Sequence, residues 1–323
     1  MKKRILAACA AILAFAGSSG SATWYVGVKP QSRLLGTSDQ PFLTVEQAAA
    51  AVRPGDTVII KSGTPDADIN CIPAGEPGKP VTIIGELLAI TSPVVLKSDQ
   101  VIDGFDIVSA GSAVKGTSVQ NVTMRNGKIH GMTGSTGMVL GGISNFLFEN
   151  IEIYDLAGHG MQVQWGTDQK GSHDGVFRKI VIHDTKVSGA LGDAFEMRHP
   201  LGGAGTQDAS ASSKITYDHC IAYNSAHDGF DLDGTDLTLI GCIAFNCGTS
   251  GTPPMRGFEF WNKNVILYNC ISHHNGGGGI SPNDTTKVYN CTLYGNAKVK
   301  FSAAFRGKSG ATIRNCIIAD NYT

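Results

Sequence analysis

A short pattern that recurs through the second half of this 323-residue chain constrains its fold more than any other feature. Each copy places an apolar residue three positions before a cysteine. The cysteines are Cys220, Cys242, Cys270, Cys291 and Cys316, so the copies are 22, 28, 21 and 25 residues apart. The cysteine position of the upstream copies is occupied by Phe105, Gly127, Ile151 and Ile180. A unit this short cannot bury its own apolar face, whereas stacked units can.

A second strand pattern occurs once in each repeat. Its copies are residues 159–163, 193–197, 228–232, 256–260 and 278–282. The third and fifth positions are apolar in nearly every copy and the fourth is polar, as expected for a strand with one buried face. Repeats of roughly 21–29 residues are typical of a β-helix whose coils stack about 4.8 Å apart, since a propeller blade needs about 40–50 residues. We predict an all-β, single-stranded, right-handed parallel β-helix.

The composition agrees with a turn-rich β protein. Glycine accounts for 41 residues, while aromatic residues make up 7% and charged residues 16% of the chain. The net charge of −1 excludes a strongly basic nucleic-acid binder, and no apolar span of 18 residues lies beyond the N-terminus. We therefore expect no nucleic acid or membrane partner, and a monomer.

The N-terminal part divides into a signal and a cap. Residues 1–22 have the basic start, apolar stretch and small residues of a secretory signal, which predicts a secreted or periplasmic protein. Residues 23–60 are expected to form an N-terminal cap and the first strand. In this segment Thr44 begins an amphipathic helix over 44–53 that would cover the open end of the β-helix at 61–323.

Two residue types are expected to form ladders between coils. The five repeated cysteines are interpreted as small apolar core residues, with a disulfide of Cys71 or Cys247 left open. The asparagines are predicted to form one turn ladder in which amides bond from coil to coil. These are Asn224, Asn246, Asn275, Asn296 and Asn321.

Stacking the copies of the second strand gathers acidic side chains on one patch. The first, fourth and sixth positions face outward and bring together Asp193, Glu196, Asp228, Asp231, Asp233 and Glu259 from three neighbouring coils. Carboxylates about 5 Å apart repel one another unless a cation neutralises them. Clustered carboxylate oxygens suit Ca²⁺, which takes 6–8 oxygen ligands. The patch therefore predicts a calcium site, and Trp261 beside it is a candidate platform for a sugar ring.

Several segments resemble a known enzyme family. Residues 224–232, Asn-Ser-Ala-His-Asp-Gly-Phe-Asp-Leu, resemble the N-S-x-D-D-G-F-D-L segment of pectate lyases of polysaccharide lyase family nine. Residues 220–224 resemble the family's C-R-A-W-x-N, residues 193–195 its D-G-F, and residues 257–258 part of its G-N-G-F-K. The resemblance implies a calcium-dependent enzyme that cleaves a uronate-containing polysaccharide by β-elimination, with a lysine as base.

The resemblance also implies roles for individual residues. Asp193, Asp228 and Asp231 match the calcium ligands, and His227 stands where the family has another aspartate. Glu259 stands where the family has its lysine, so either Arg198 or Lys263 replaces that base or the lyase reaction is lost. The candidate catalytic residues are thus Arg198, Lys263 and Glu259. The candidate substrate-binding residues are Trp261, Glu196 and Asn283.

Three functions follow from these residues. The first is a polysaccharide lyase. The second is a glycoside hydrolase in which Asp231 with Glu259, or Glu196 with Asp231, acts as acid and base. The third is a β-helix protein that binds carbohydrate without cleaving it.

Overall fold

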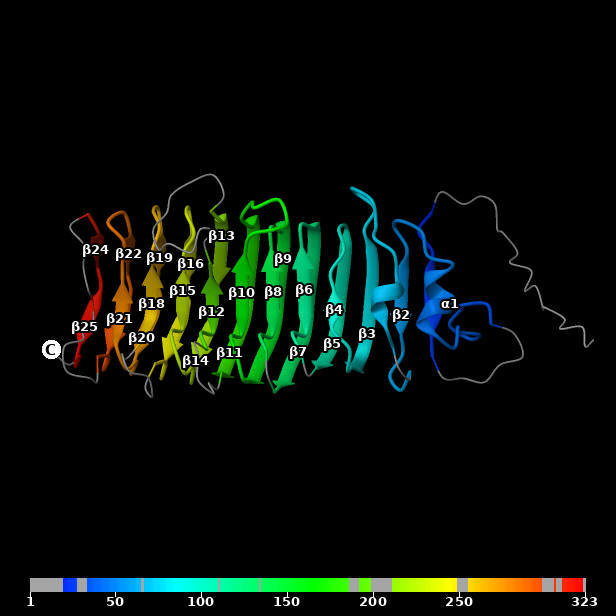
Figure 1. Cartoon of the computed structure of the whole chain (residues 1–323), viewed down its shortest axis with the longest axis horizontal. Helices are drawn as coiled ribbons and strands as arrows, with labels where there is room; N and C mark the ends of the chain where they lie inside the picture. Colours follow the sequence, from blue (N-terminus) through cyan, green and yellow to red (C-terminus); the bar gives the residue numbers. More distant parts are fainter. Residues whose placement is uncertain are drawn as a thin grey trace, which may run out of the picture.

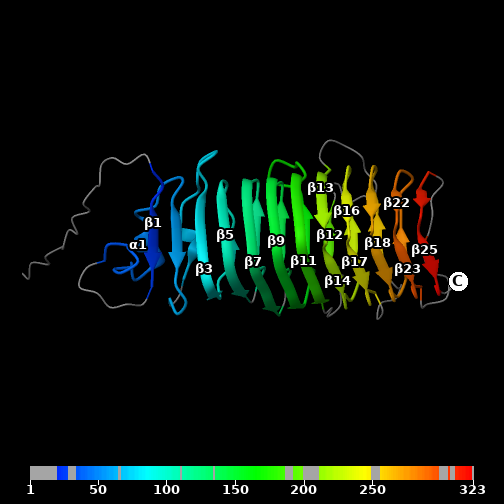
Figure 2. The ribbon, with the colours of Figure 1, turned by 180° about the vertical axis from the view of Figure 1, so that it is seen from behind.

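The computed structural model describes residues 20–27, 34–64, 67–109, 111–133, 135–185, 192–198, 211–248, 255–297, 305 and 310–321. These residues form an elongated solenoid whose coils follow one another along its long axis (Figures 1 and 2). Successive coils pair through parallel strands, as between β7 (Gln120–Met132), β9 (Ser144–Leu156) and β11 (His173–Thr185). The predicted parallel β-helix is confirmed. Residues 1–19 of the predicted signal lie outside the described residues.

The described strands form two sheets that run along the solenoid. The larger sheet holds β7, β9 and β11 together with β1 (Thr23–Val26), β2 (Thr57–Ile60), β3 (Val81–Ile90), β5 (Gln100–Val108), β13 (Ser213–Asp218), β14 (Ile221–Tyr223), β16 (Thr238–Ile240), β17 (Ile243–Phe245), β19 (Ile266–Tyr268), β20 (Ile271–His273), β22 (Lys287–Tyr289), β23 (Thr292–Tyr294), β24 (Thr312–Arg314) and β25 (Ile317–Ala319). The smaller sheet holds β4 (Val94–Val95), β6 (Val114–Thr117), β8 (Met138–Gly141), β10 (Met161–Gln164), β12 (Phe195–Met197), β15 (Phe230–Leu232), β18 (Arg256–Phe260) and β21 (Gly278–Ser281).

The larger sheet turns a corner at one residue in each coil. In β7, β9 and β11 this residue is Asn126, Asn150 or Lys179, with φ of 56°, 53° and 50°. From β13 onward the strand divides in two at the same place, where His219 has φ of 53°. Asparagine accepts the left-handed conformation more readily than most residues, which explains its frequency here.

The cysteine ladder lies directly after this corner and points into the core. Cys220, Cys242, Cys270 and Cys291 are buried, and the pairing register stacks them above one another. The prediction of core residues is confirmed for these four, whereas Cys316 at the end of the ladder is only partly buried against the core. All cysteines among the described residues are free, so neither the exposed Cys71 nor the buried Cys247 forms a disulfide there.

The asparagine ladder differs from its prediction, because the five asparagines occupy two adjacent positions. Asn224 and Asn246 are left-handed turn residues with φ of 51° and 52°. Asn275, Asn296 and Asn321 fall one position later in the coil, as the pairing register shows. Their amides bond from coil to coil, at 2.9 Å from Asn275 Nδ2 to Asn296 Oδ1 and 3.1 Å from Asn296 Nδ2 to Asn321 Oδ1.

The N-terminal helix is shorter than predicted. Helix α1 spans Val45–Ala49, and Thr44 caps it through a reciprocal capping box with Gln47. It ends early because the Ala51 N–H bonds to Ala48 O, three residues back, which tightens the last turn. A helix of five residues is about 7 Å long, so the structure does not show the predicted cap over the end of the solenoid. The other helical element in the described part of the chain, η1 (Ile69–Cys71), is a single 3₁₀ turn, and no described helix is long and apolar enough to cross a bilayer.

The smaller sheet positions the acidic residues. Its inner face stacks Phe195, Phe230 and Phe258, with ring centroids 4.4 Å and 4.8 Å apart. Its outer face carries the residue at the predicted fourth position of each coil, and the strand pairing places each of these residues next to the one in the following coil. This outward ladder is Gln162, Glu196, Asp231, Glu259 and Ser281. The buried phenylalanine stack thus holds the outward ladder at the spacing of the strands.

Candidate functional site

The turn before each strand of the smaller sheet adds a second row of polar residues. Asp193 precedes β12, Asp228 precedes β15, and Arg256 begins β18. The row is held in order because Ala194 N–H donates to Asp228 O and Gly229 N–H donates to Arg256 O, both at 3.0 Å. This row and the outward ladder together form the acidic cluster, which we define as Asp193, Glu196, Asp228, Asp231 and Glu259.

Small residues after the first position let neighbouring coils approach closely at this row. A Cβ on Gly160 would lie 2.2 Å from Ile182 Cγ2 and 2.7 Å from Ala194 O. A Cβ on Gly229 would lie 2.7 Å from Gly257 O. The glycines therefore bring the backbones together and set the preceding residues, His159 and Asp228, beside the next coil.

Asp193 lies at the centre of the cluster and is 1% exposed. Its Oδ1 accepts hydrogen bonds from His227 Nδ1 at 2.5 Å and from the Asp228 N–H at 2.8 Å. His159 Nδ1 lies 3.3 Å from Oδ2. Burial alone would raise the pKa of Asp193, but the two imidazoles outweigh it and lower the pKa to about 2. The two histidines therefore favour the ionised form of Asp193.

Asp228 and Asp231 are shifted in the opposite direction. Burial, followed by the charges of Asp193 and Glu259, raises the pKa of Asp228 to about 7. Burial, followed by the charges of Asp193 and Asp228, raises the pKa of Asp231 to about 9. The buried Asp228 Oδ2 has no hydrogen-bond partner among the described residues. Carboxylates in this position would be stabilised by a cation, which removes both the repulsion and the unsatisfied oxygen.

Glu259 has a partner that sequence reasoning did not assign. Arg256, three residues earlier on β18, donates from Nη1 to Glu259 Oε2. The backbone N–H of Arg256 also donates to Asp228 Oδ1. Burial raises the pKa of Glu259, although Arg256 opposes this shift. The position where the family resemblance places a lysine thus holds a buried carboxylate paired with an arginine.

The opposite edge of the cluster is built around Glu196. Arg198 Nε donates to Glu196 Oε1 at 2.6 Å, and Gln162 Nε2 donates to Glu196 Oε2 at 2.5 Å. His159 Nδ1 lies 3.4 Å from Glu196 Oε2. The side chain of Arg198 is 43% exposed, so its guanidinium extends from the cluster toward solvent. Among the predicted catalytic residues, Glu259 therefore belongs to the acidic cluster and Arg198 borders it.

The other predicted residues lie at the end of β18 and beyond it. The Trp261 indole is partly exposed, and its Nε1 donates to Asp231 Oδ1 at 2.7 Å, which fixes the ring beside the cluster. Asn283 is buried and donates from Nδ2 to Trp261 O at 2.7 Å. Lys263 is exposed in the turn after β18. The tryptophan thus remains accessible for a ligand, whereas the amide group of Asn283 supports the Trp261 backbone.

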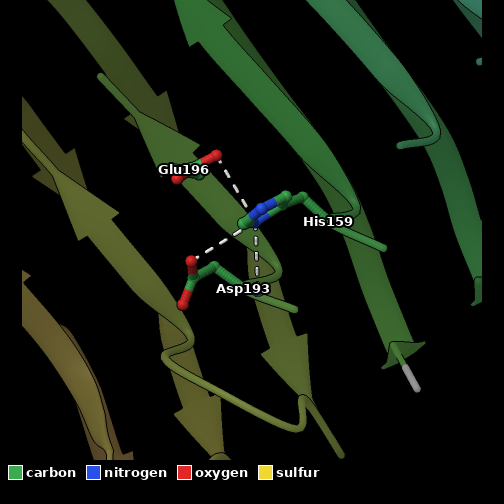
Figure 3. Close-up of side chains that lie close together, drawn as sticks. All are labelled: His159, Asp193 and Glu196. Carbon is green, nitrogen blue, oxygen red and sulfur yellow. Dashed lines mark hydrogen bonds and ion pairs between the residues drawn. The ribbon is translucent and has the colours of Figure 1, made fainter. Parts of the chain in front are cut away.

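Among the described residues, two groups of side chains have the geometry to hold a metal ion. They are His159 with Asp193 and Glu196 (Figure 3), and Asp193 with His227 and Asp228. In the second group, carboxylates are the oxygen ligands that Ca²⁺ requires, and the unsatisfied Asp228 Oδ2 supports this fit. His227 fits calcium less well, because it offers nitrogen and its Nδ1 proton is directed at Asp193.

His159 and Arg256 are the functional candidates to which sequence reasoning gave no role. Both occupy the first position of the second strand pattern, in line with Asp193 and Asp228. That alignment was the available signal, because it places a histidine and an arginine in the same row as two acids. The direction of each side chain along the row depends on the packing between coils and could not be obtained from spacing.

Known proteins share this architecture along most of the chain. The family described as Pel9A-like, right-handed beta helix region matches residues 24–315. No curated protein matches the chain. Among solved structures, pectate lyase Pel9A is similar with a TM-score of 0.55 and 17% identity, covering 94% of this chain and 80% of that one. A rhamnogalacturonan lyase has a TM-score of 0.51 and 17% identity, covering 93% and 87%.

A viral protein also has this fold. The gp42 tailspike of Acinetobacter phage vb_AbaP_AS12 has a TM-score of 0.55 and 16% identity, with 81% of this chain and 52% of the tailspike covered. The chain thus spans about half of the tailspike's length. Because identities this low establish the fold alone, the family assignment depends on the match to residues 24–315. By that match, the chain belongs to the Pel9A-like right-handed beta-helix family.

Proposed function

We propose that this protein is an exported, calcium-dependent polysaccharide lyase that cleaves a uronate-containing polymer by β-elimination. The observation that carries the proposal is the stack of Asp193, Asp228 and Asp231 on adjacent coils, with two of the three pKa values raised by burial and mutual repulsion. Such a stack favours binding of a cation. The similar solved structures named as pectate and rhamnogalacturonan lyases support the substrate class.

In this proposal Asp193, Asp228 and Asp231 hold the calcium ion, and His227 orients Asp193. Calcium, when bound, neutralises the uronate carboxylate and lowers the energy of the charge that develops on it. Trp261 provides a flat apolar surface for a sugar ring beside Asp231. The hydrogen bond from the indole N–H to Asp231 holds the indole in this orientation. The cationic Arg198 extends from Glu196 toward solvent, where it can pair with a second carboxylate of the polymer.

Glu259 is the base that fits the site best among the three candidates. It lies on the outward ladder next to Asp231, at the position where the family resemblance places the lysine base. Arg198 is a poor base because a guanidinium does not release its proton in proteins. The base removes the proton on the carbon next to the uronate carboxylate. The electron pair forms a carbon–carbon double bond, and the 4-linked sugar oxygen leaves and takes up a proton.

A product assay tests the proposal. The chain should be incubated with pectate, rhamnogalacturonan and alginate in calcium or in chelator, while unsaturated ends and reducing ends are both measured. A calcium-dependent unsaturated product is expected on one of these polymers. Reducing ends without unsaturation would instead indicate hydrolysis by the paired carboxylates. Binding without any product would indicate a carbohydrate-binding protein, and either result would overturn the lyase proposal.

A further inference from the structure

We propose that His159, Asp193 and Glu196 form a second metal centre that binds a zinc-like transition-metal ion. This centre lies beside the calcium site proposed above and does not depend on the lyase reaction. It uses two residues, His159 and Glu196, that are outside the calcium ligands suggested by the family resemblance.

The three side chains converge from two neighbouring coils (Figure 3). His159 comes from the turn before β10, while Asp193 and Glu196 come from the next coil, before and within β12. His159 Nδ1 lies 3.3 Å from Asp193 Oδ2 and 3.4 Å from Glu196 Oε2. The residues are 8%, 1% and 5% exposed, respectively. They therefore form a preformed, nearly buried set of one nitrogen and two oxygen atoms.

The hydrogen bonds around these atoms leave one acceptor unsatisfied. Asp193 Oδ2 is buried and has no hydrogen-bond partner among the described residues, which is costly in a buried site. The bond that His159 Nδ1 accepts from the backbone N–H of Asp193 is long, at 3.3 Å, and an ion would take its place. Glu196 Oε2 accepts from Gln162 Nε2 and keeps a second lone pair for an ion.

A cation between these three atoms would satisfy Asp193 Oδ2, and the spacing of the atoms favours a small ion. Ligand atoms about 2.0–2.1 Å from a tetrahedral Zn²⁺ lie about 3.3–3.4 Å from each other. This matches the two distances from His159 Nδ1. An imidazole nitrogen also favours zinc over calcium, because Ca²⁺ selects oxygen ligands. The fourth position of the tetrahedron would be taken by water or by an oxygen of a bound sugar.

The two carboxylate oxygens of Asp193 keep this centre distinct from the calcium site. Oδ1 accepts from His227 Nδ1 and the Asp228 N–H, whereas Oδ2 faces His159. Each side of the carboxylate therefore serves a different group of residues. An ion at the His159 side leaves Asp228 and Asp231 available for calcium.

Metal content measured by equilibrium dialysis tests this proposal. Wild-type protein should retain one zinc ion per chain when calcium is present in excess. His159→Ala and Glu196→Gln should each bind zinc at least tenfold more weakly. Asp231→Asn, which changes only the calcium side, should keep the zinc affinity of the wild type. His173→Ala removes an exposed histidine on the larger sheet and is the matched control for loss of an imidazole.

Zinc bound equally well by His159→Ala, or displaced from the wild type by calcium, would overturn the proposal. Anomalous diffraction from zinc-soaked crystals of the wild type gives a test that does not depend on the folding of a variant. The expected peak lies between His159, Asp193 and Glu196. A peak elsewhere, or no peak, would overturn the proposal.

Discussion

At the scale of single residues, the protonation of each carboxylate in the site depends on which charged side chains lie next to it. Two histidines lower the pKa of Asp193, whereas burial and the neighbouring acids raise the pKa values of Asp228 and Asp231. Glu259 is compensated by Arg256. Residues of the same type thus acquire different protonation behaviour within three coils, which separates the cation ligands from the candidate base.

The assignment of Glu259 as base gives a prediction on activity. Glu259→Gln keeps the size of the side chain but cannot accept a proton, so the rate of unsaturated product formation should fall by about 10²–10⁴-fold. Lys263→Ala is the matched control, because Lys263 is exposed beyond the end of β18. It should stay within about twofold of the wild type. If the lysine variant loses activity and Glu259→Gln retains it, Lys263 is the base.

The raised pKa of Asp231 gives a prediction on stability in the absence of metal. An acid whose pKa is near 3.9 in the unfolded chain and about 9 in the folded protein binds protons better when folded. Its contribution to stability is therefore full below about pH 4 and is lost as the pH rises through 9. In chelator, the free energy of unfolding should decrease over this window, and Asp231→Asn should make the decrease shallower.

Denaturant titrations at several pH values measure this effect. Asp39→Asn is the control, because Asp39 is an exposed acid near the N-terminal helix. Its pH profile should follow that of the wild type. An unchanged slope in Asp231→Asn would contradict the assignment of a protonated Asp231.

At the scale of elements, the strands of the smaller sheet support the site through their inner faces. Phe195, Phe230 and Phe258 stack directly beneath Glu196, Asp231 and Glu259, since each phenylalanine precedes an outward residue by one position. Loss of the middle ring should therefore affect both stability and the spacing of the acids above it.

Phe230→Ala should lower the free energy of unfolding by about 3–5 kcal/mol, because it removes a fully buried ring and leaves a cavity. Tyr268→Ala, at a half-exposed aromatic residue of β19, should cost less than about 1 kcal/mol. Chemical denaturation of both variants gives the comparison. Equal losses would indicate that the phenylalanine stack does not determine the stability of these coils.

The repeats allowed most of the residue order along the strands of the smaller sheet to be predicted from the sequence. The order of Gln162, Glu196, Asp231, Glu259 and Ser281 followed from alignment of the second strand, because a parallel β-helix places equivalent residues in register. The positions of the asparagines in the coil were harder to predict. A left-handed turn residue and the inward residue after it both favour asparagine, so Asn246 and Asn275 were assigned to one ladder although they occupy adjacent positions.

Side-chain pairing was beyond the reach of repeat spacing. Arg256 and His159 were placed in the correct row, but the pairing of Arg256 with Glu259 depends on rotamers selected by the packing between coils. The length of α1 was also mispredicted, because the alanines after Ala49 favour a helix locally while a tighter turn ends it. The geometry of the chain as it enters the first coil therefore outweighed the local helix propensity of these alanines.

At the scale of the whole molecule, a solenoid transmits the effect of a bound ion only a short distance. Each coil contacts its two neighbours, so stability is distributed along the axis in nearly independent steps. An ion held by Asp193, Asp228 and Asp231 joins two adjacent coils and lies against a third that carries Glu259. Calcium should therefore stabilise the middle of the C-terminal half and leave distant coils unchanged.

Hydrogen exchange measured with calcium and with chelator tests this locality. At a calcium concentration of about 100 Kd, the bound ion contributes about 2.7 kcal/mol, which corresponds to about 100-fold slower exchange of amides that exchange by opening of the site. We expect slowing within 193–198, 228–233 and 256–261, and none within 120–132. Asp228→Asn should abolish the slowing, because it removes the oxygen that lacks a hydrogen-bond partner. Slowing along the entire solenoid would instead mean that its coils unfold as one cooperative unit, and slowing that persists in Asp228→Asn would place the ion elsewhere.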